Sequence, residues 1–294
     1  MKPAPFEYLR ARTTHEALTE LVLKPSSKPI AGGQSLGAMM NLRVARPGFL
    51  IDVGRIPELR THERKPDRLL IGACVTHAEI EDDVIDDVTS GFLPYVAGRI
   101  AYRPVRNRGT IGGSIAHADP AADWVTALTA VGASVVLESP VAVRETTNWW
   151  SRLRSSAGGA PNRRTVDMTS FICAPYSTAL EPGELVIGVE IPAASADMRW
   201  GYEKFCRKVG ELAEAIGAVV IDPQRRFARV VVGAVGGKPV ILDAATHTLA
   251  STTKAPAFEE LVGEIDRKLA RLEPVKRQHA AVCVERAIAE ALRA

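Results

Sequence analysis

Two glycine pairs, each followed by a hydroxyl side chain, constrain this chain more than any other feature of its sequence. The first lies in Ala31-Gly32-Gly33-Gln34-Ser35-Leu36 and the second in Thr110-Ile111-Gly112-Gly113-Ser114. Glycine reaches positive φ and has no Cβ, so a ligand can come close to the backbone N–H groups of such a run. One run can hold one phosphate, and two runs about 80 residues apart could hold both halves of a pyrophosphate. Two tight turns are the alternative, because glycine pairs are common in turns.

Length and composition place the chain among ordinary globular proteins. Its 294 residues predict about two domains, and 46% hydrophobic residues supply enough apolar material for a core. The 37 basic and 34 acidic side chains nearly balance, which argues against nucleic acid and membrane surfaces as partners. No apolar stretch reaches the ~18 residues of a membrane span. The amino end carries no apolar secretory segment, so we expect a cytoplasmic protein.

Neither cysteines nor histidines show the spacing of a metal site. The four cysteines, Cys74, Cys173, Cys206 and Cys283, lie far apart without a C-x-x-C pair. The six histidines form no H-x-x-x-H pair. We therefore expect no metal site and no iron–sulfur cluster within this chain, and we expect the thiols to be buried and inert.

The first glycine run sits in a β-loop-α-β pattern. A short strand ends at Ile30–Ala31, a helical composition covers 36–44, and 49–53 predicts a second strand. Capping boxes at Thr13–Glu16 and Thr76–Glu79 predict two further helix starts. More elements are expected at 68–74 and 134–138 as strands, and at 92–101 and 121–131 as helices.

The second half of the chain has an antiparallel texture. Strand patterns occupy 185–191, 200–206, 215–221 and 227–234, and helical stripes fill the carboxyl end. The fold class is therefore α+β, with a division near residue 176. Residues 139–165 are basic and contain Trp149–Trp150; they predict a surface excursion whose tryptophans pack on their own domain or contact a partner.

Known nucleotide and hydrolase motifs do not explain the glycine runs. No Gly-Lys-Ser/Thr follows either run, neither is G-x-G-x-x-G, and the chain has no G-x-S-x-G elbow. A dinucleotide held by two separate runs remains as the interpretation.

Four segments in order resemble a known family. AGGQSLGAMMNLR, RNRGTIGGSIAHADPAAD, PYSTALEPGELV and YEKFCRKVGELAEA are similar to the FAD-binding medium subunit of molybdenum hydroxylases. The nearest type is aerobic carbon monoxide dehydrogenase, and the flavin domain of xanthine dehydrogenase is related. The resemblance runs from about residue 4 to 285. Gln34 and Ala174 depart from it, because relatives usually have histidine or a small polar residue at the first position and glycine at the second.

The resemblance implies an α+β fold with two domains. Residues 1–175 would form a two-part FAD-binding domain of the PCMH, or vanillyl-alcohol-oxidase-like, kind, with lobes at about 1–55 and 56–175. Residues 176–294 would form a smaller carboxyl-terminal domain of the carbon monoxide dehydrogenase flavoprotein type, an antiparallel sheet with helices.

The resemblance also implies which residues bind FAD. Backbone N–H groups of the first run would wrap the pyrophosphate, and the second run would contact the other phosphate and the ribityl chain. Asp119 and Asp123 would hydrogen-bond the ribityl or phosphate side, Leu180 would lie near the adenine, and Lys204 would stabilise the reduced, anionic ring. The full cofactor-binding set is Ala31, Gly32, Gly33, Gln34, Ser35, Leu36, Thr110, Gly112, Gly113, Ser114, Ala118, Asp119, Asp123, Leu180 and Lys204.

Two of these residues keep a structural alternative. Asp123 could cap a helix that starts at Trp124, and Lys204 could be an exposed strand lysine. No residue of this chain is implied to be catalytic or to bind metal.

The function implied is electron transfer within a complex. A large subunit would carry molybdopterin cytosine dinucleotide, a small subunit would carry two [2Fe–2S] clusters, and the assembly would be a dimer of heterotrimers. Electrons would pass through the clusters to FAD and on to quinone, NAD or oxygen. Two alternatives stay open: a stand-alone flavin oxidoreductase, and an assembly subunit without flavin. The first would need acid or base groups in the carboxyl-terminal part, where the sequence shows no such cluster.

Overall fold

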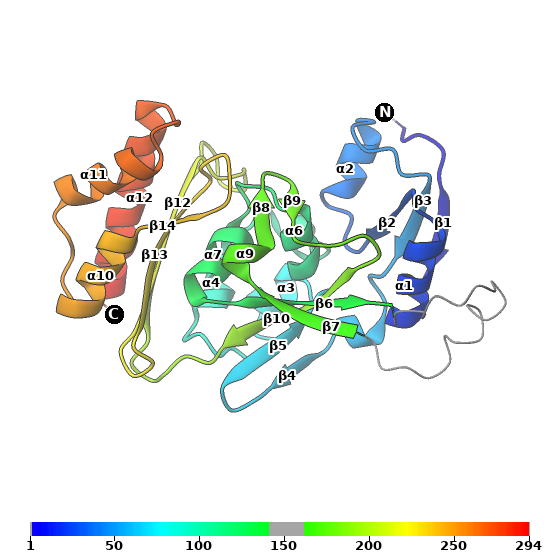
Figure 1. Ribbon diagram of the computed structural model, residues 1–294, viewed down its shortest axis with the longest axis horizontal. Coiled ribbons are helices and arrows are strands. Elements are labelled where there is room, and N and C mark those ends of the chain that lie inside the picture. The colour runs from blue at the N-terminus through cyan, green and yellow to red at the C-terminus, as the bar shows by residue number, and fades with distance from the viewer. Residues whose placement is uncertain (1, 141–161, 294) are drawn as a thin grey trace, which may run out of the picture.

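The computed structural model describes residues 2–140 and 162–293. Three parts follow one another across Figure 1: a small unit around β1–β3, a central part around a five-stranded sheet, and a four-stranded sheet covered by helices. Helices and strands are mixed within the first two parts and segregated in the third. The arrangement confirms the α+β class.

The first part is the β-loop-α-β unit that the sequence predicts. Its parallel sheet has the order β1-β3-β2, and α1 and α2 flank the strands. Thr13 caps α1, since its hydroxyl accepts from the N–H of Glu16 at 3.1 Å. The bounds are β1 (Glu7–Arg10), α1 (Thr14–Leu23), β2 (Ser27–Ile30), α2 (Leu36–Asn41) and β3 (Phe49–Asp52). The first glycine run joins β2 directly to α2.

The central part is an antiparallel sheet in the order β4-β5-β10-β6-β7. Its core includes the fully buried Trp124 of α7. The strands are β4 (His62–Arg64), β5 (Arg68–Gly72), β6 (Ser134–Ser139), β7 (Asn162–Asp167) and β10 (Leu185–Pro192), and the helices are α3 (His77–Glu81), α4 (Phe92–Arg99), α5 (Arg103–Arg106), α6 (Ile111–His117) and α7 (Asp123–Val131). Short elements complete it: η1 (Pro57–Leu59), α9 (Met168–Phe171), β8 (Ile172–Ala174) and β9 (Ser177–Thr178).

The division of the chain near residue 176 differs from the sheet pairing. β10 lies beyond that point, yet it is the middle strand, paired with β5 on one side and β6 on the other. The predicted boundary lies before β10 because a turn-rich stretch precedes this strand, and the sequence pattern after that stretch resembles the antiparallel strands that follow. The excursion expected over 139–165 is also shorter than predicted, since β6 reaches Ser139 and β7 begins at Asn162. Trp149–Trp150 lie outside the described residues.

The third part confirms the antiparallel texture. Its sheet has the order β11-β12-β13-β14, and α12 lies across β11 and β12. The bounds are β11 (Arg199–Phe205), β12 (Ala215–Asp222), β13 (Phe227–Gly233), β14 (Val240–Ile241), α10 (Asp243–Thr252), α11 (Phe258–Lys268) and α12 (Pro274–Arg293). Gly201 permits the close approach of α12, because a Cβ there would lie 1.9 Å from the Ala287 carbonyl oxygen.

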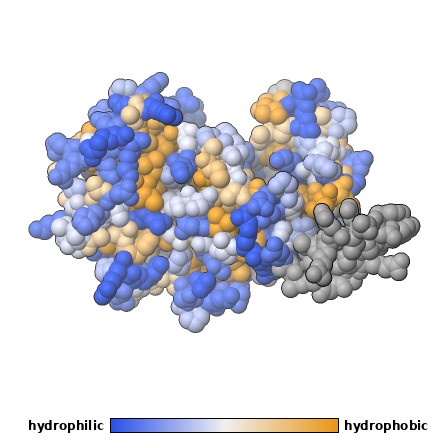
Figure 2. All heavy atoms as spheres, viewed as in Figure 1, coloured by the Kyte–Doolittle hydropathy of each residue, from blue (hydrophilic) through white to orange (hydrophobic). Residues whose placement is uncertain are grey.

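The surface dips between the first and third parts. Figure 2 shows its outline hollowed between the lobe that carries α2 and the lobe that carries α10–α12. Within 2–140 and 162–293, no helix combines the length and apolarity that a bilayer crossing requires. All four cysteines are unpaired; Cys74 and Cys283 are buried as expected, but Cys173 is exposed, so the expectation of four buried thiols is wrong.

The contact at Gly201 generates a stability prediction. Gly201→Ala forces α12 away from β11 and should lower the unfolding free energy by about 3 kcal/mol. The added methyl group would collide with the α12 backbone, which cannot move aside as a flexible side chain can. Gly237→Ala is the matched control, since a Cβ at Gly237 meets nothing within 4 Å. Urea unfolding of both variants checks this. Equal stabilities for the two variants would contradict the close packing of α12.

Candidate functional site

The first glycine run presents a row of unused backbone donors. Among the described residues, the N–H groups of 32–36 donate to no protein acceptor, whereas the carbonyls of Gly33 and Ser35 accept helical bonds from Gly37 and Met39 at 3.0 Å. Gly33 has φ +71°, and the Gln34 amide folds back onto the Gly32 carbonyl at 3.2 Å. Gln34 and Ser35 are exposed. Unpaired backbone N–H groups in a row favour an anionic ligand.

The second glycine run forms the first turns of helix α6 and is neither an open ligand-binding run like the first nor a tight turn. Thr110 caps α6, and its hydroxyl accepts from the N–H of Gly113 at 3.2 Å. The N–H of Gly112 donates to the Ala73 carbonyl at 2.9 Å. A Cβ at Gly112 would lie 2.4 Å from the Ala73 Cβ, so this glycine seats α6 against the end of β5. Within this run, the exposed Gly113 and the half-buried Ser114 are the residues that leave surface for a ligand.

The two runs meet through a residue that the sequence interpretation missed. A Cβ at Gly32 would lie 1.9 Å from the Arg108 carbonyl oxygen, so the two backbones are in direct contact. The Arg108 guanidinium Nε also donates to the Gly32 carbonyl at 3.5 Å. The sequence offered one clue to a role for Arg108, since Arg108–Gly109 directly precedes the helix cap Thr110.

The carboxyl end of α6 carries an aromatic pair. The rings of His117 and Tyr176 lie 5.2 Å apart, and the Ala118 carbonyl accepts from the N–H of Tyr176 at 2.9 Å. Asp119 accepts from the N–H of Ala121 at 2.9 Å and faces the Tyr176 hydroxyl at 3.5 Å. The negative charge of Asp119 raises the pKa of Tyr176. Ala118 and Asp119 therefore lie beside an exposed aromatic face.

Leu180 is half-buried and packs against the central core.

Asp123 and Lys204 form a buried ion pair. Lys204 Nζ lies 2.9 Å from Asp123 Oδ2, and the side chains are 5% and 4% exposed. The Tyr202 hydroxyl donates to Asp123 Oδ1 at 2.8 Å. Burial raises the pKa of the Asp123 carboxyl, and the Lys204 charge opposes that rise.

Both structural alternatives for these residues are wrong. α7 begins at Asp123 with Ala122 as its N-cap, and Lys204 is buried rather than exposed. Lys204 also lines a cavity of about 330 Å³ together with Tyr102, Arg106 and Val209, and no residue of the first glycine run lines it.

A buried histidine lies behind the second run. His77 Nδ1 accepts from the Trp124 indole N–H at 3.0 Å, and the backbone N–H of His77 donates to the Gly109 carbonyl at 2.9 Å. Burial first, and the charge of Arg106 second, lower the pKa of His77 to about 4. The imidazole is therefore neutral at physiological pH, with its proton on Nε2.

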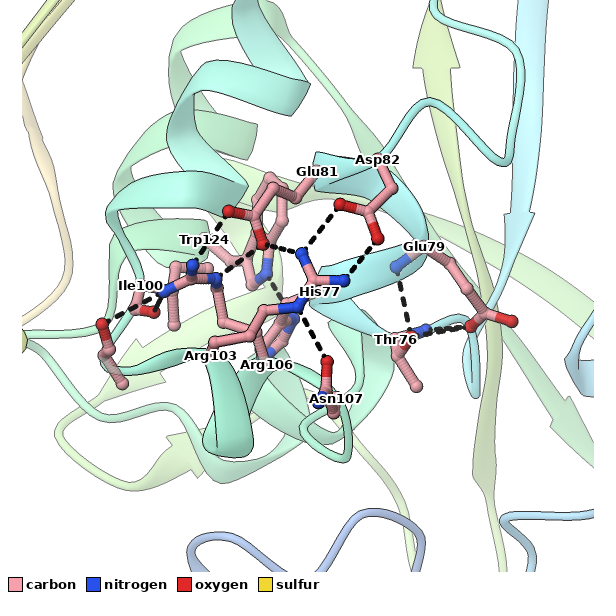
Figure 3. Close-up of polar contacts among 11 residues, drawn as sticks. Thr76, His77, Glu79, Glu81, Asp82, Ile100, Arg103, Arg106, Asn107 and Trp124 are labelled. Atoms are coloured by element: carbon pink, nitrogen blue, oxygen red, sulfur yellow. Dashed lines mark hydrogen bonds and ion pairs between the residues drawn. The ribbon is translucent and has the colours of Figure 1, made fainter.

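Ion pairs join α3 to α5 beside this histidine. Arg106 binds Glu81 through two bonds of 2.7 and 2.8 Å, and Arg103 bonds to Glu81 and Asp82. Figure 3 shows these side chains converging between the two helices, with His77 and Trp124 behind them. No cluster of metal-ligating side chains occurs in the described part of the chain.

Comparison with known proteins identifies the family. Residues 4–148 match the family described as the FAD binding domain in molybdopterin dehydrogenase. The carbon monoxide dehydrogenase medium chain of Hydrogenophaga pseudoflava is 37% identical over 75% of this chain and 70% of its own length. The chain belongs to the FAD-binding medium-chain family of the molybdopterin dehydrogenases. The nicotine 6-hydroxylase medium subunit of Paenarthrobacter nicotinovorans is 34% identical, and the match covers 91% of this chain and 88% of that subunit.

A solved structure extends the likeness over the whole medium chain. A carbon monoxide dehydrogenase structure from Hydrogenophaga pseudoflava matches with a TM-score of 0.85 at 34% identity, covering 100% of this chain and 99% of that one. The family relationship inferred from the four sequence segments is thus confirmed, as is FAD as the cofactor of its domain. The chain belongs to a family of oxidoreductase subunits.

His77 generates a prediction on pH. The unfolded chain binds a proton at His77 below pH 6.5, whereas the folded chain binds it only near pH 4. The folded state therefore keeps its full stability with respect to His77 above pH 6.5. As the pH falls from 6.5 towards 4, protonation of His77 in the unfolded chain lowers the unfolding free energy by about 3 kcal/mol. Wild type and His77→Asn, unfolded in urea at pH 7.5 and pH 4, should differ in stability by less at the lower pH. The same stability difference at both pH values would contradict the neutral, buried imidazole.

The buried ion pair generates a second prediction. Lys204→Met leaves the Asp123 carboxylate uncompensated and should cost about 3–5 kcal/mol of unfolding free energy. Asp123→Asn combined with Lys204→Met should recover most of this loss, because Asn still accepts from Tyr202. Chemical denaturation of the three proteins checks it. A double variant as unstable as Lys204→Met would rule out an unpaired charge as the cause.

Proposed function

We propose that this chain is the FAD-containing electron-transfer subunit of a molybdenum hydroxylase complex. It takes electrons from [2Fe–2S] clusters of a partner and passes them to an external acceptor. The row of unpaired N–H groups at 32–36 carries the proposal, because it is the local structure that a pyrophosphate requires. The family to which the chain belongs supports it.

The described residues fit the cofactor. A pyrophosphate has the negative oxygens that the free donors of the first run need, and the exposed Tyr176 beside Asp119 suits a planar base. Bound FAD would supply the redox chemistry, exchanging electrons one or two at a time. The residues of this chain bind it, orient it and set the charge around it. A subunit without flavin would have no need of five unused donors in one run.

We propose the following residue roles. Residues 31–36 hold the first phosphate, and Thr110, Gly112, Gly113 and Ser114 shape the wall beside it, with Gly113 and Ser114 as the contacting surface. Ala118, Asp119 and Asp123 are assigned to the ribityl or phosphate side and Leu180 to the adenine side. Ala118 and Asp123 are buried, so Asp119 is the one of the three that reaches the surface. Lys204 is paired with Asp123, and the combined electrostatic field of the two charges adjusts the stability of the reduced flavin ring. The FAD-binding domain extends to Pro192, since β10 belongs to its sheet.

Partner subunits complete the electron path. Relatives are named medium chains or medium subunits, which supports a large subunit with molybdopterin cytosine dinucleotide and a small subunit with two [2Fe–2S] clusters. We propose a dimer of such heterotrimers. Relatives named for carbon monoxide, nicotine and caffeine share this fold, so the substrate is selected on another subunit.

Flavin content tests the proposal. Gly33→Val places a branched side chain at φ +71° and covers the donor row, while Gly113→Val puts a Cβ 2.7 Å from the Thr110 hydroxyl that caps α6. Both variants, reconstituted with FAD, should lose the flavin absorbance band. Gly37→Ala is the control, because its Cβ meets nothing within 4 Å. Wild-type flavin content in both valine variants would refute the two-run site, and a wild-type chain without flavin would refute the function.

A further inference from the structure

We propose that His77 is the positioning residue of the FAD site: it fixes the turn at 108–110 and thereby the placement of the two glycine runs against each other. The inference rests on the proposed function, because its consequence is cofactor affinity. His77 itself touches no cofactor; it acts through the backbone of Gly109 and Arg108.

The imidazole is held between two elements of the central part. The Trp124 indole of α7 donates to Nδ1 at 3.0 Å, and a Cβ at Gly109 would lie 2.7 Å from Nε2 and 2.8 Å from Cδ2. His77 is 5% exposed, and Trp124 is fully buried. The ring therefore fills the space between α7 and the turn, which explains why residue 109 is glycine.

Backbone pairing carries this position into the turn. The His77 N–H donates to the Gly109 carbonyl at 2.9 Å, Thr76 pairs with Thr110 in an antiparallel bridge, and the Ile111 N–H donates to Val75 at 3.0 Å. Residues 75–77 thus run alongside 109–111. A displaced His77 moves the turn, and the turn carries the Arg108 carbonyl that contacts Gly32.

Only the neutral imidazole can accept the Trp124 hydrogen bond that holds it in place, because the indole N–H is a donor and needs an acceptor at Nδ1. The charged group that acts on His77 is Arg106 of α5, which is bound in turn by Glu81 of α3. α7 offers the uncharged indole of Trp124, and the turn offers the backbone of Gly109. In Figure 3, Arg106 binds Glu81, and the Trp124 indole nitrogen points to the His77 ring. A positive charge near the ring reinforces its neutral state.

The test separates cofactor affinity from folding. The Kd for FAD is measured on the apo chain by flavin fluorescence at pH 7.5, with the apo Tm in parallel, for wild type, His77→Leu, His77→Asn, Gly109→Ala and Gly37→Ala. His77→Leu and Gly109→Ala should each raise the Kd by about tenfold or more, because misplacing a binding group by a fraction of an ångström is costly. His77→Asn keeps an acceptor at the Nδ1 position and should recover most of the affinity. Gly37→Ala should match wild type.

Each outcome decides the inference. A fall in apo Tm with an unchanged Kd in both His77→Leu and Gly109→Ala overturns it and leaves His77 as a packing residue. If His77→Leu does not fold, Gly109→Ala decides alone, since it retains both the imidazole and the indole. A wild-type chain that binds no FAD overturns the proposed function and this inference with it, whereas wild-type binding shared equally by all variants overturns the inference alone.

Discussion

The backbone contact between Gly32 and Arg108 determines how the two glycine runs of the proposed cofactor site are placed. It joins the β-loop-α-β unit to the central part, across 76 residues of sequence. No side chain fits there, because a Cβ at Gly32 would lie 1.9 Å from a carbonyl oxygen. The position of the donor row at 32–36 is therefore set by the turn that precedes α6. A residue that fixes the turn at 108–110 therefore also fixes the position of the donor row.

The two glycine runs perform different physical tasks although they look alike in sequence. In the first run the backbone donors are left unpaired, and Gly33 adopts φ +71°, in the left-handed region that favours glycine. In the second run they allow close packing, and the donors of Ile111, Gly112 and Gly113 are all used within the chain. One run offers hydrogen bonds to a ligand, and the other supplies a rigid wall. A rigid wall lowers the entropy that the site loses when the dinucleotide binds.

Sequence patterns predicted the local elements well and the long-range partners poorly. The β-loop-α-β unit and the Thr76–Glu79 capping box were readable because neighbouring residues specify them. The helix at 111–117 was missed, since a glycine pair lowers helix propensity and only tertiary packing on Ala73 overcomes it. The partnership of Asp123 with Lys204 spans 81 residues, and that of His77 with Trp124 spans 47. Such pairs have no local signal in the sequence. The glycine run of the proposed site could therefore be recognised from sequence, whereas the residues that support it could not.

Amide signals of the first run test the central claim most directly. Titrating FAD into the ¹⁵N-labelled apo chain should move the amide protons of residues 32–36 downfield and slow their exchange with solvent. The amides of Gly112 and Gly113 should change far less, because each already has an acceptor within the chain. FAD binding that leaves the amides of 32–36 unshifted and unprotected would contradict the account.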